Sequence, residues 1–173
     1  MSDVLTLDDV RLGGKVVLYR VDVNSPLEPS SGAFLDDSRL RAIIPTLRTL
    51  QNSKVVMLGH QSRPGKIDFT NMEQHADRIS RLIGKKVKFI SDICGDEAIS
   101  SIKNLKIGEM LFLDNIRMHD DENSMKKASL EETAQSEIVR KLSAVIDVYV
   151  TDAFAASHRN SPSLTGFYDS VPC

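Results

Sequence analysis

The sequence predicts an α/β fold of the doubly wound type, in which a mainly parallel sheet lies between helices on both faces in a Rossmann-like three-layer arrangement. Five short segments rich in β-branched residues recur along the chain, and several are apolar almost throughout, as in VVMLG and MLFL. Strands of this kind are usually covered on both faces, as in a parallel sheet. Stretches with helical spacing separate them, and this alternation favours right-handed β-α-β crossovers.

The expected strands are residues 15–22, 54–60, 86–91, 109–114 and 147–152. All five carry the residue types that are enriched in strands. Residues 38–50 form the first expected helix. Its apolar residues recur on one stripe, namely Leu40, Ile43, Ile44, Leu47 and Leu50. Asp36, Asp37 and Ser38 provide a cap and negative charge for its first turn.

Three further helices are expected in the remaining gaps between strands. Residues 72–83 form a helix that ends at Gly84, a residue type that commonly stops helices in the left-handed conformation. Residues 96–105 form a shorter helix, and residues 130–145 form a longer one with Ile138, Leu142 and Val145 on one side. The polar segment 119–129 (HDDENSMKKAS) is expected to be a solvated surface loop ahead of that last helix.

The composition is that of one globular domain able to bury a full core, with 173 residues, 41% hydrophobic and 27% charged. A net charge of -2 gives no overall field that would attract nucleic acid or an anionic membrane. No apolar run reaches the roughly 20 residues that span a bilayer, and the acidic N-terminus does not resemble a signal peptide, so we expect a cytoplasmic protein. Cys94 and Cys173 lack the spacing of a disulfide framework or a zinc site, which predicts a buried Cys94 and a free terminal Cys173.

Charged residues gather where the predicted strands end. Four arginines (Arg39, Arg63, Arg117 and Arg159) and two histidines (His60 and His158) fall beside one predicted edge of the sheet. Ligands of parallel sheets bind outside the carboxyl ends of the strands, where helix N-termini also converge. Because guanidinium groups match carboxylate and phosphate oxygens two at a time, this edge is predicted to be a site for a small ligand with more than one anionic group. Asp22 and Asn24 share one side of their strand and could hold a hydroxyl of the ligand or orient an arginine.

Other interpretations of these residues remain open at this point. Any single arginine beyond a strand is commonly a solvated residue or the partner of an acid, and the histidines could be ordinary core or surface residues. With His75 and His119 they show no metal-ligand spacing, so no metal site is predicted. Gly13-Gly14-Lys15 and Gly65-Lys66 fit neither nucleotide-binding glycine motif, so we expect turns there and no nucleotide site in this chain.

Five segments together resemble the phosphoglycerate kinase family, in its archaeal form, over residues 16–167. They read RVDVNSP, DDSRLRAIIPTL, GHQSRPG, LDNIR and VTDAFAASHR, in the order that the family has. The resemblance implies that residues 1–173 are the amino-terminal, 3-phosphoglycerate-binding domain. It also implies a substrate-binding set of Asp22, Val23, Asn24, Arg39, His60, Gln61, Ser62, Arg63, Arg117 and Arg159. Within it, Asp22 and Asn24 would hold the glycerate, His60 and three arginines would surround the phosphate, and Arg39 would be catalytic.

The resemblance further implies phosphoryl transfer between 1,3-bisphosphoglycerate and ADP, as in glycolysis and gluconeogenesis. A carboxylate acceptor with a pKa near 4 is already ionised at neutral pH, so the reaction needs charge neutralisation and positioning but no general base. Mg-ATP or Mg-ADP would bind a second, C-terminal α/β domain beyond residue 173, and without it this chain would be inactive. The complete enzyme would be a monomer or homodimer that acts on small molecules.

Two rival functions are compatible with the same residues. The first is a non-catalytic anion-binding or regulatory module that has kept the site without the kinase half. The second is a nucleic-acid-binding domain that uses the arginine edge. The nearly neutral charge and the aromatic content of 5%, with no Trp, disfavour the second because they leave little for base stacking.

Overall fold

The computed structural model describes residues 5–156 and 159–172, and its centre is one parallel sheet of five strands. The strands are β1 (Val16–Arg20), β2 (Lys54–Leu58), β3 (Val87–Phe89), β4 (Met110–Phe112) and β5 (Val148–Thr151). Their order in the sheet is β3-β4-β2-β1-β5. Each strand lies within one of the five predicted segments, so the strands and their parallel arrangement are confirmed.

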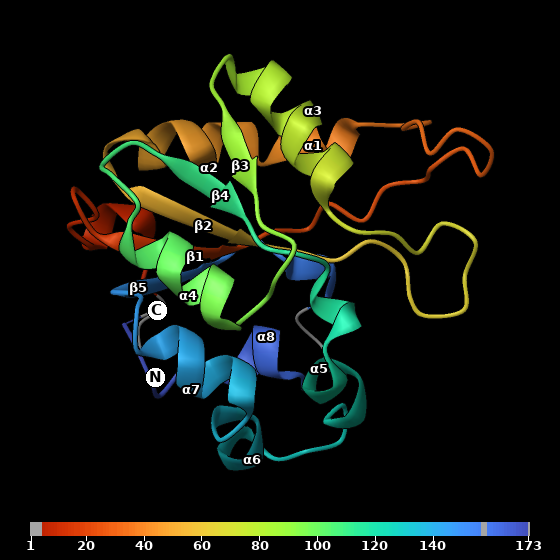
Figure 1. The fold of residues 1–173 in the computed structure, drawn as a ribbon. Helices are drawn as coiled ribbons and strands as arrows, with labels where there is room; N and C mark the ends of the chain where they lie inside the picture. Colours follow the sequence, from red (N-terminus) through yellow and green to blue (C-terminus); the bar gives the residue numbers. More distant parts are fainter. Residues whose placement is uncertain (1–4, 157–158, 173) are drawn as a thin grey trace.

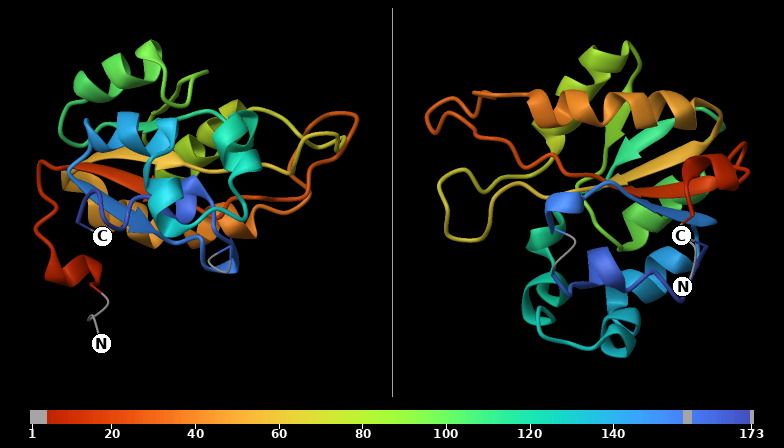
Figure 2. Two further views of the ribbon diagram at one scale, coloured as in Figure 1. Left: turned by 90° about the horizontal axis from the view of Figure 1, so that it is seen from below. Right: turned by 180° about the vertical axis from the view of Figure 1, so that it is seen from behind.

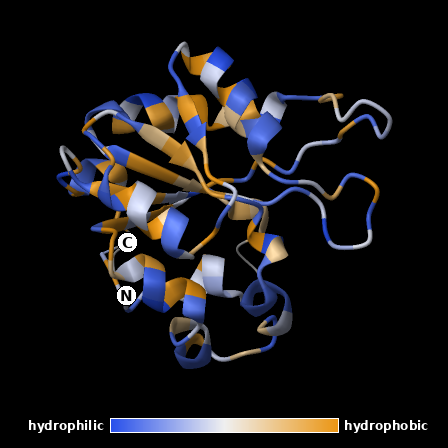
Figure 3. Cartoon of the chain, in the orientation of Figure 1, coloured by the Kyte–Doolittle hydropathy of each residue, from blue (hydrophilic) through white to orange (hydrophobic). Residues whose placement is uncertain are grey.

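Helices cover both faces of the sheet, as Figures 1 and 2 show. One layer contains α1 (Ser38–Ala42), α2 (Ile44–Thr49) and α3 (Glu73–Ile83), and the other contains α4 (Asp96–Lys103), α7 (Glu137–Ser143) and α8 (Pro162–Thr165). Each layer packs its own hydrophobic core against one face of the sheet. Within β1, Val17 and Tyr19 belong to the core under α1, α2 and α3, while Leu18 belongs to the core under α4 and α7. Because both faces are buried, most residues of the strands are apolar, as the hydropathy colouring in Figure 3 shows. The predicted doubly wound, three-layer fold is confirmed.

Two of the predicted helices are each divided into two. The segment 38–50 forms α1 and α2 with a break at Ile43, followed by the 3₁₀ turn η2 (Leu50–Asn52). Pro45 lies in the first turn of α2 and has no N–H to donate back to the preceding turn. It therefore interrupts the predicted helix and is accommodated at the start of a new one. The segment 130–145 forms α6 (Leu130–Ala134) and α7. Here Ser136 accepts a hydrogen bond from the Val139 N–H and caps a new helix.

The helices α3 and α4 lie close to their predicted limits. α3 ends at Gly84, whose φ of 68° is the predicted left-handed stop. α4 begins at Asp96 as expected and ends two residues early, at Lys103.

The prediction of a solvated loop over residues 119–129 was wrong. This segment contains α5 (Asp120–Ser124). Its N-cap is His119, whose ring accepts a hydrogen bond from the Asp121 N–H at 3.2 Å. Glu122 in this helix is only 5% exposed. Four short elements were also not predicted, namely α8 and the 3₁₀ turns η1 (Leu7–Asp9), η3 (Ile116–Met118) and η4 (Phe154–Ala156).

The loops at the carboxyl edge of the sheet are long and extend away from the core. Residues 24–36 fold back on themselves through an antiparallel bridge between Leu27 and Phe34. Together with residues 61–71, they form the two projecting loops in Figure 1. Within the described residues, none of the helices has the length and apolar character needed to cross a bilayer.

Candidate anion-binding site

Backbone hydrogen bonds connect the segments that follow β4, β2, β1 and β5 at the carboxyl edge of the sheet. The Val21 N–H donates to the Leu58 carbonyl at 2.9 Å, and the Ile116 N–H donates to the Gly59 carbonyl at 3.0 Å. The Asp152 N–H donates to the Arg20 carbonyl at 2.9 Å. These bonds bring loops that are distant in sequence to a common edge, where the polar residues of each loop can form one site.

A pocket of about 530 Å³ opens at this edge. Its described lining consists of four cations and two amides, namely Arg63, Arg117, Lys126, Arg159, Asn123 and Asn160. The expectation that arginines distant in sequence converge there is confirmed for Arg63, Arg117 and Arg159. Lys126 and Asn123 were missed because the segment that carries them was predicted to be an unrelated surface loop. Asn160 directly follows Arg159, and nothing in its sequence context distinguishes it.

Arg117 is held in place within a strongly positive environment. Its Nη1 donates a hydrogen bond to the Ser62 carbonyl, which ties the loop after β4 to the loop after β2. Partial burial lowers the pKa of its guanidinium, and the positive charges of Arg159, Arg20 and Arg63 lower it further. Like charges held this close repel one another, so an anion in the pocket would relieve an existing repulsion.

His60 lies beside the arginines as a buried, neutral ring. Burial and the positive charges of the neighbouring arginines lower its pKa from 6.5 to about 2. The arginines responsible are Arg20, Arg117, Arg159 and Arg39. The His60 ring therefore stays uncharged at any working pH and acts through its hydrogen bonds.

Arg39 and Asp22 form an ion pair between the start of α1 and the end of β1. The Arg39 side chain is 45% exposed and that of Asp22 is 18% exposed. Arg39 does not belong to the described lining of the pocket, although its charge contributes to the low pKa of His60. An exposed guanidinium paired with a single carboxylate is free to reorient toward an incoming anion.

Asn24, Ser62 and Gln61 support the loops around the pocket. The Asn24 side-chain oxygen accepts the Ser62 N–H at 2.8 Å, and Ser62 has a left-handed φ of 55°, which is unusual for a residue other than glycine. Gln61 is fully buried and bonds both backbone groups of Ser25 as well as the His75 ring. The side chain of Val23 is also fully buried. A contact between either Val23 or Gln61 and a ligand would therefore have to use the backbone.

Residues 7–173 match the family model for phosphoglycerate kinase. The chain belongs to the phosphoglycerate kinase family. It is 45% identical over 169 residues to the phosphoglycerate kinase of Methanothermobacter thermautotrophicus, with 96% of this chain and 41% of that protein covered. The corresponding protein of Archaeoglobus fulgidus is 46% identical over 167 residues, with 96% and 40% covered.

The crystal structure of phosphoglycerate kinase from Pyrococcus horikoshii OT3 superimposes on this chain with a TM-score of 0.93 at 41% identity. The match covers 98% of this chain and 41% of that structure. The chain thus spans about 40% of the length of the phosphoglycerate kinases that it matches.

Over residues 5–156 and 159–172, no group of three or more His, Cys, Asp or Glu residues could hold a metal ion. Gly14 and Gly65 have positive φ values of 75° and 83° and lie in turns, as predicted. His158 and Cys173, for which the sequence predicted a place at the arginine edge and a free thiol, lie outside the described residues.

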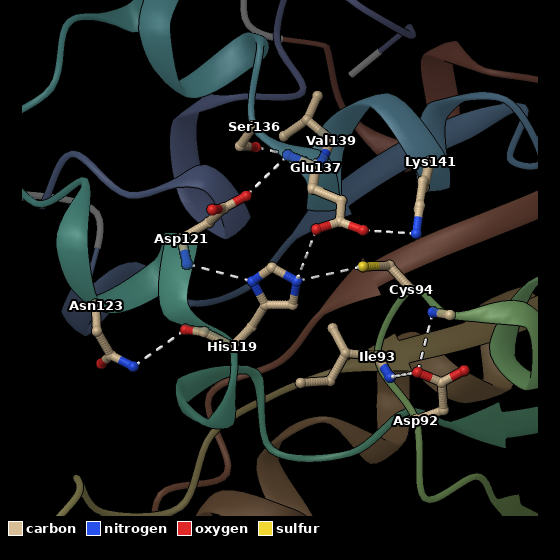
Figure 4. A network of polar contacts seen from close by, with 11 residues as sticks. Asp92, Ile93, Cys94, His119, Asp121, Asn123, Ser136, Glu137, Val139 and Lys141 are labelled. Carbon is tan, nitrogen blue, oxygen red and sulfur yellow. Dashed lines mark hydrogen bonds and ion pairs between the residues drawn. The ribbon is translucent and has the colours of Figure 1, made fainter.

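A second polar cluster lines a smaller pocket of about 340 Å³, whose described lining shares no residue with that of the arginine pocket (Figure 4). His119 lies between the Cys94 thiol, 3.6 Å from its Nε2, and the Glu137 carboxylate, 3.8 Å from the same atom. Burial raises the pKa of Cys94 to about 11, and the negative charge of Glu137 contributes. Cys94 is buried, as predicted, and it is a protonated thiol at neutral pH.

Proposed function

We propose that residues 1–173 form the substrate-binding domain of a phosphoglycerate kinase and bind 3-phosphoglycerate at the carboxyl edge of the sheet. The observation that carries this proposal is the pocket in which Arg63, Arg117, Arg159 and Lys126 converge from separate loops. A ligand with a phosphate and a carboxylate matches that charge, and guanidinium groups bind both kinds of anion through paired hydrogen bonds. Membership of the family supports the choice of ligand.

The individual roles are those that the resemblance to the family implies. Arg63, Arg117 and Arg159 hold the phosphate together with His60, while Asp22 and Asn24 hold the glycerate. The backbone groups of Val23 and Gln61, together with Ser62, complete the substrate-binding set. Arg39 leaves Asp22 to meet the substrate carboxylate and neutralises the phosphoryl group in transfer, which makes it the catalytic residue. The acceptor carboxylate is already ionised, so positioning and electrostatic stabilisation supply the catalysis.

The magnesium-bound nucleotide that the family uses would bind a second domain outside this chain. The complete enzyme would be a cytoplasmic monomer or homodimer without nucleic-acid partners, and it would serve glycolysis and gluconeogenesis. The purified 173-residue chain should therefore bind 3-phosphoglycerate and turn nothing over. A coupled assay for ATP-dependent phosphorylation of 3-phosphoglycerate checks this, and turnover above a blank without protein would contradict it.

Arg63→Ala should weaken 3-phosphoglycerate binding about tenfold or more, because charge-assisted hydrogen bonds contribute about 1.5–3 kcal/mol. Calorimetric titration of the two chains measures this. Arg48→Ala is the matched control, since Arg48 is also exposed but lies in α2, outside the pocket lining. An Arg63→Ala titration that matches the Arg48→Ala titration would contradict the site.

Inorganic phosphate distinguishes the proposed domain from a general anion-binding module. A substrate domain should prefer 3-phosphoglycerate over inorganic phosphate, because the carboxylate and hydroxyl add contacts to Arg39, Asp22 and Asn24. Equal affinity for the two ligands would favour the non-catalytic module.

A further inference from the structure

Arg20, at the end of β1, is a fully buried guanidinium that has no place in the substrate-binding set. It is only 1% exposed. Its Nη1 donates to the Val21 carbonyl at 2.6 Å, and its Nε donates to the Ser163 hydroxyl at 3.1 Å. Its Nη2 lies 3.2 Å from Nδ1 of His60. Arg20 therefore connects the interior of the protein to a histidine beside the pocket.

The charge that balances Arg20 comes from Glu122 in α5. Glu122 accepts the Ser161 and Ser163 hydroxyls at 2.8 and 2.7 Å, and its second oxygen accepts the Ser163 N–H at 3.0 Å. The Ser163 hydroxyl thus donates to Glu122 and accepts from Arg20. A single hydroxyl bridges two buried opposite charges, and burial of either charge without the other would be costly.

The direction of these hydrogen bonds fixes the proton on His60. A guanidinium has donors only, so Nδ1 of His60 must accept from Arg20. A ring that accepts at Nδ1 and is neutral carries its proton on Nε2. The low pKa of His60, about 2, agrees with the neutral ring.

We propose that Arg20 is a positioning residue, anchored by Glu122 through Ser163, which holds His60 in the Nε2–H tautomer so that the ring donates to an anionic oxygen of the ligand. The identity of that ligand rests on the proposed function. The opposite tautomer would turn a lone pair toward the phosphate oxygens and repel them. A neutral N–H donor adds a hydrogen bond without adding to the repulsion among the arginines.

Nitrogen NMR of the histidine rings in the unliganded chain tests the tautomer directly. We expect His60 to show an unprotonated Nδ1 and a protonated Nε2, unchanged from pH 8 to pH 5. A protonated Nδ1 would overturn the proposal. This measurement uses no ligand, so a failure of the proposed function, seen as no binding of 3-phosphoglycerate by the wild-type chain, remains distinguishable.

The double variant Arg20→Met with Glu122→Gln removes both buried charges together, which avoids leaving one of them unpaired. We expect its His60 spectrum to become a mixture of both tautomers. An unchanged Nε2–H spectrum in a folded double variant would overturn the proposal.

Ser163→Ala and Ser161→Ala form a matched pair that tests the bridge without removing a charge. Both hydroxyls contact Glu122, but only that of Ser163 also accepts from Arg20. We expect Ser163→Ala to weaken 3-phosphoglycerate binding about threefold to tenfold, and Ser161→Ala to change it less than about twofold. Equal losses in both variants would show a merely structural effect and would overturn the proposal.

Discussion

Replacing Glu122 with alanine should lower the free energy of unfolding by about 3–5 kcal/mol, the cost of breaking a buried charge pair from one side. The variant leaves the Arg20 guanidinium buried without its compensating carboxylate. It also leaves two serine hydroxyls and the Ser163 N–H without their acceptor.

Urea denaturation of the wild-type and variant chains measures this loss as a shift of the unfolding midpoint. Asp120→Ala is the control, because Asp120 is an exposed acid in the same helix and its replacement should change stability by no more than about 0.5 kcal/mol. Equal midpoints for the Glu122 and Asp120 variants would show that Glu122 does not balance Arg20.

The environment of Glu122 also explains why the sequence misled over residues 119–129. The run HDDENSMKKAS is polar at nearly every position, which is typical of a surface loop. The burial of Glu122 within this run depends on hydrogen bonds from Ser161 and Ser163, which lie 39 and 41 residues after Glu122 in the chain. Local pattern carries no information about partners so distant, so neither α5 nor the place of Lys126 in the pocket was predictable.

The features that were predicted correctly depend on local signals or on general rules of sheet geometry. Apolar β-branched runs marked the five strands, and the convergence of strand ends placed Arg63, Arg117 and Arg159 at one edge. The two helix breaks also have local signals, Pro45 and Ser136. They were not predicted because the apolar residues on either side of each break continue along one stripe, which favoured a single helix. Arg20 looked like an ordinary strand residue, because its partners come from two other segments of the chain.

The free energy of unfolding should begin to fall near pH 6.5 as the pH is lowered, well before the carboxylates become protonated. His75 should be a main cause of this loss. His75 is fully buried against Phe34 and Gln61, and burial lowers its pKa from 6.5 to about 4. Between these two values the unfolded chain binds a proton that the folded chain does not, so stability falls as the pH is lowered. The difference corresponds to about 3 kcal/mol, and His60 acts in the same direction.

His75→Gln separates the contribution of this ring from that of His60. Glutamine does not titrate, so in this variant the slope of unfolding free energy against pH should decrease by about 1.4 kcal/mol per pH unit between pH 6.5 and 4. Urea denaturation at several pH values gives both slopes, and only the slopes are compared because the substitution also changes packing. Parallel slopes would mean that His75 is protonated as readily in the folded chain as in the unfolded one.

The position of β1 in the sheet has a consequence for how the chain folds during synthesis. β1 precedes the other four described strands along the chain, yet it lies between β2 and β5, and the Val16 N–H donates to the side chain of Asp147, 131 residues away. One edge of β1 therefore stays unpaired until residues 148–151 have left the ribosome. An open apolar strand edge recruits strands from other chains, so nascent copies of this protein are most prone to aggregate just before translation of β5.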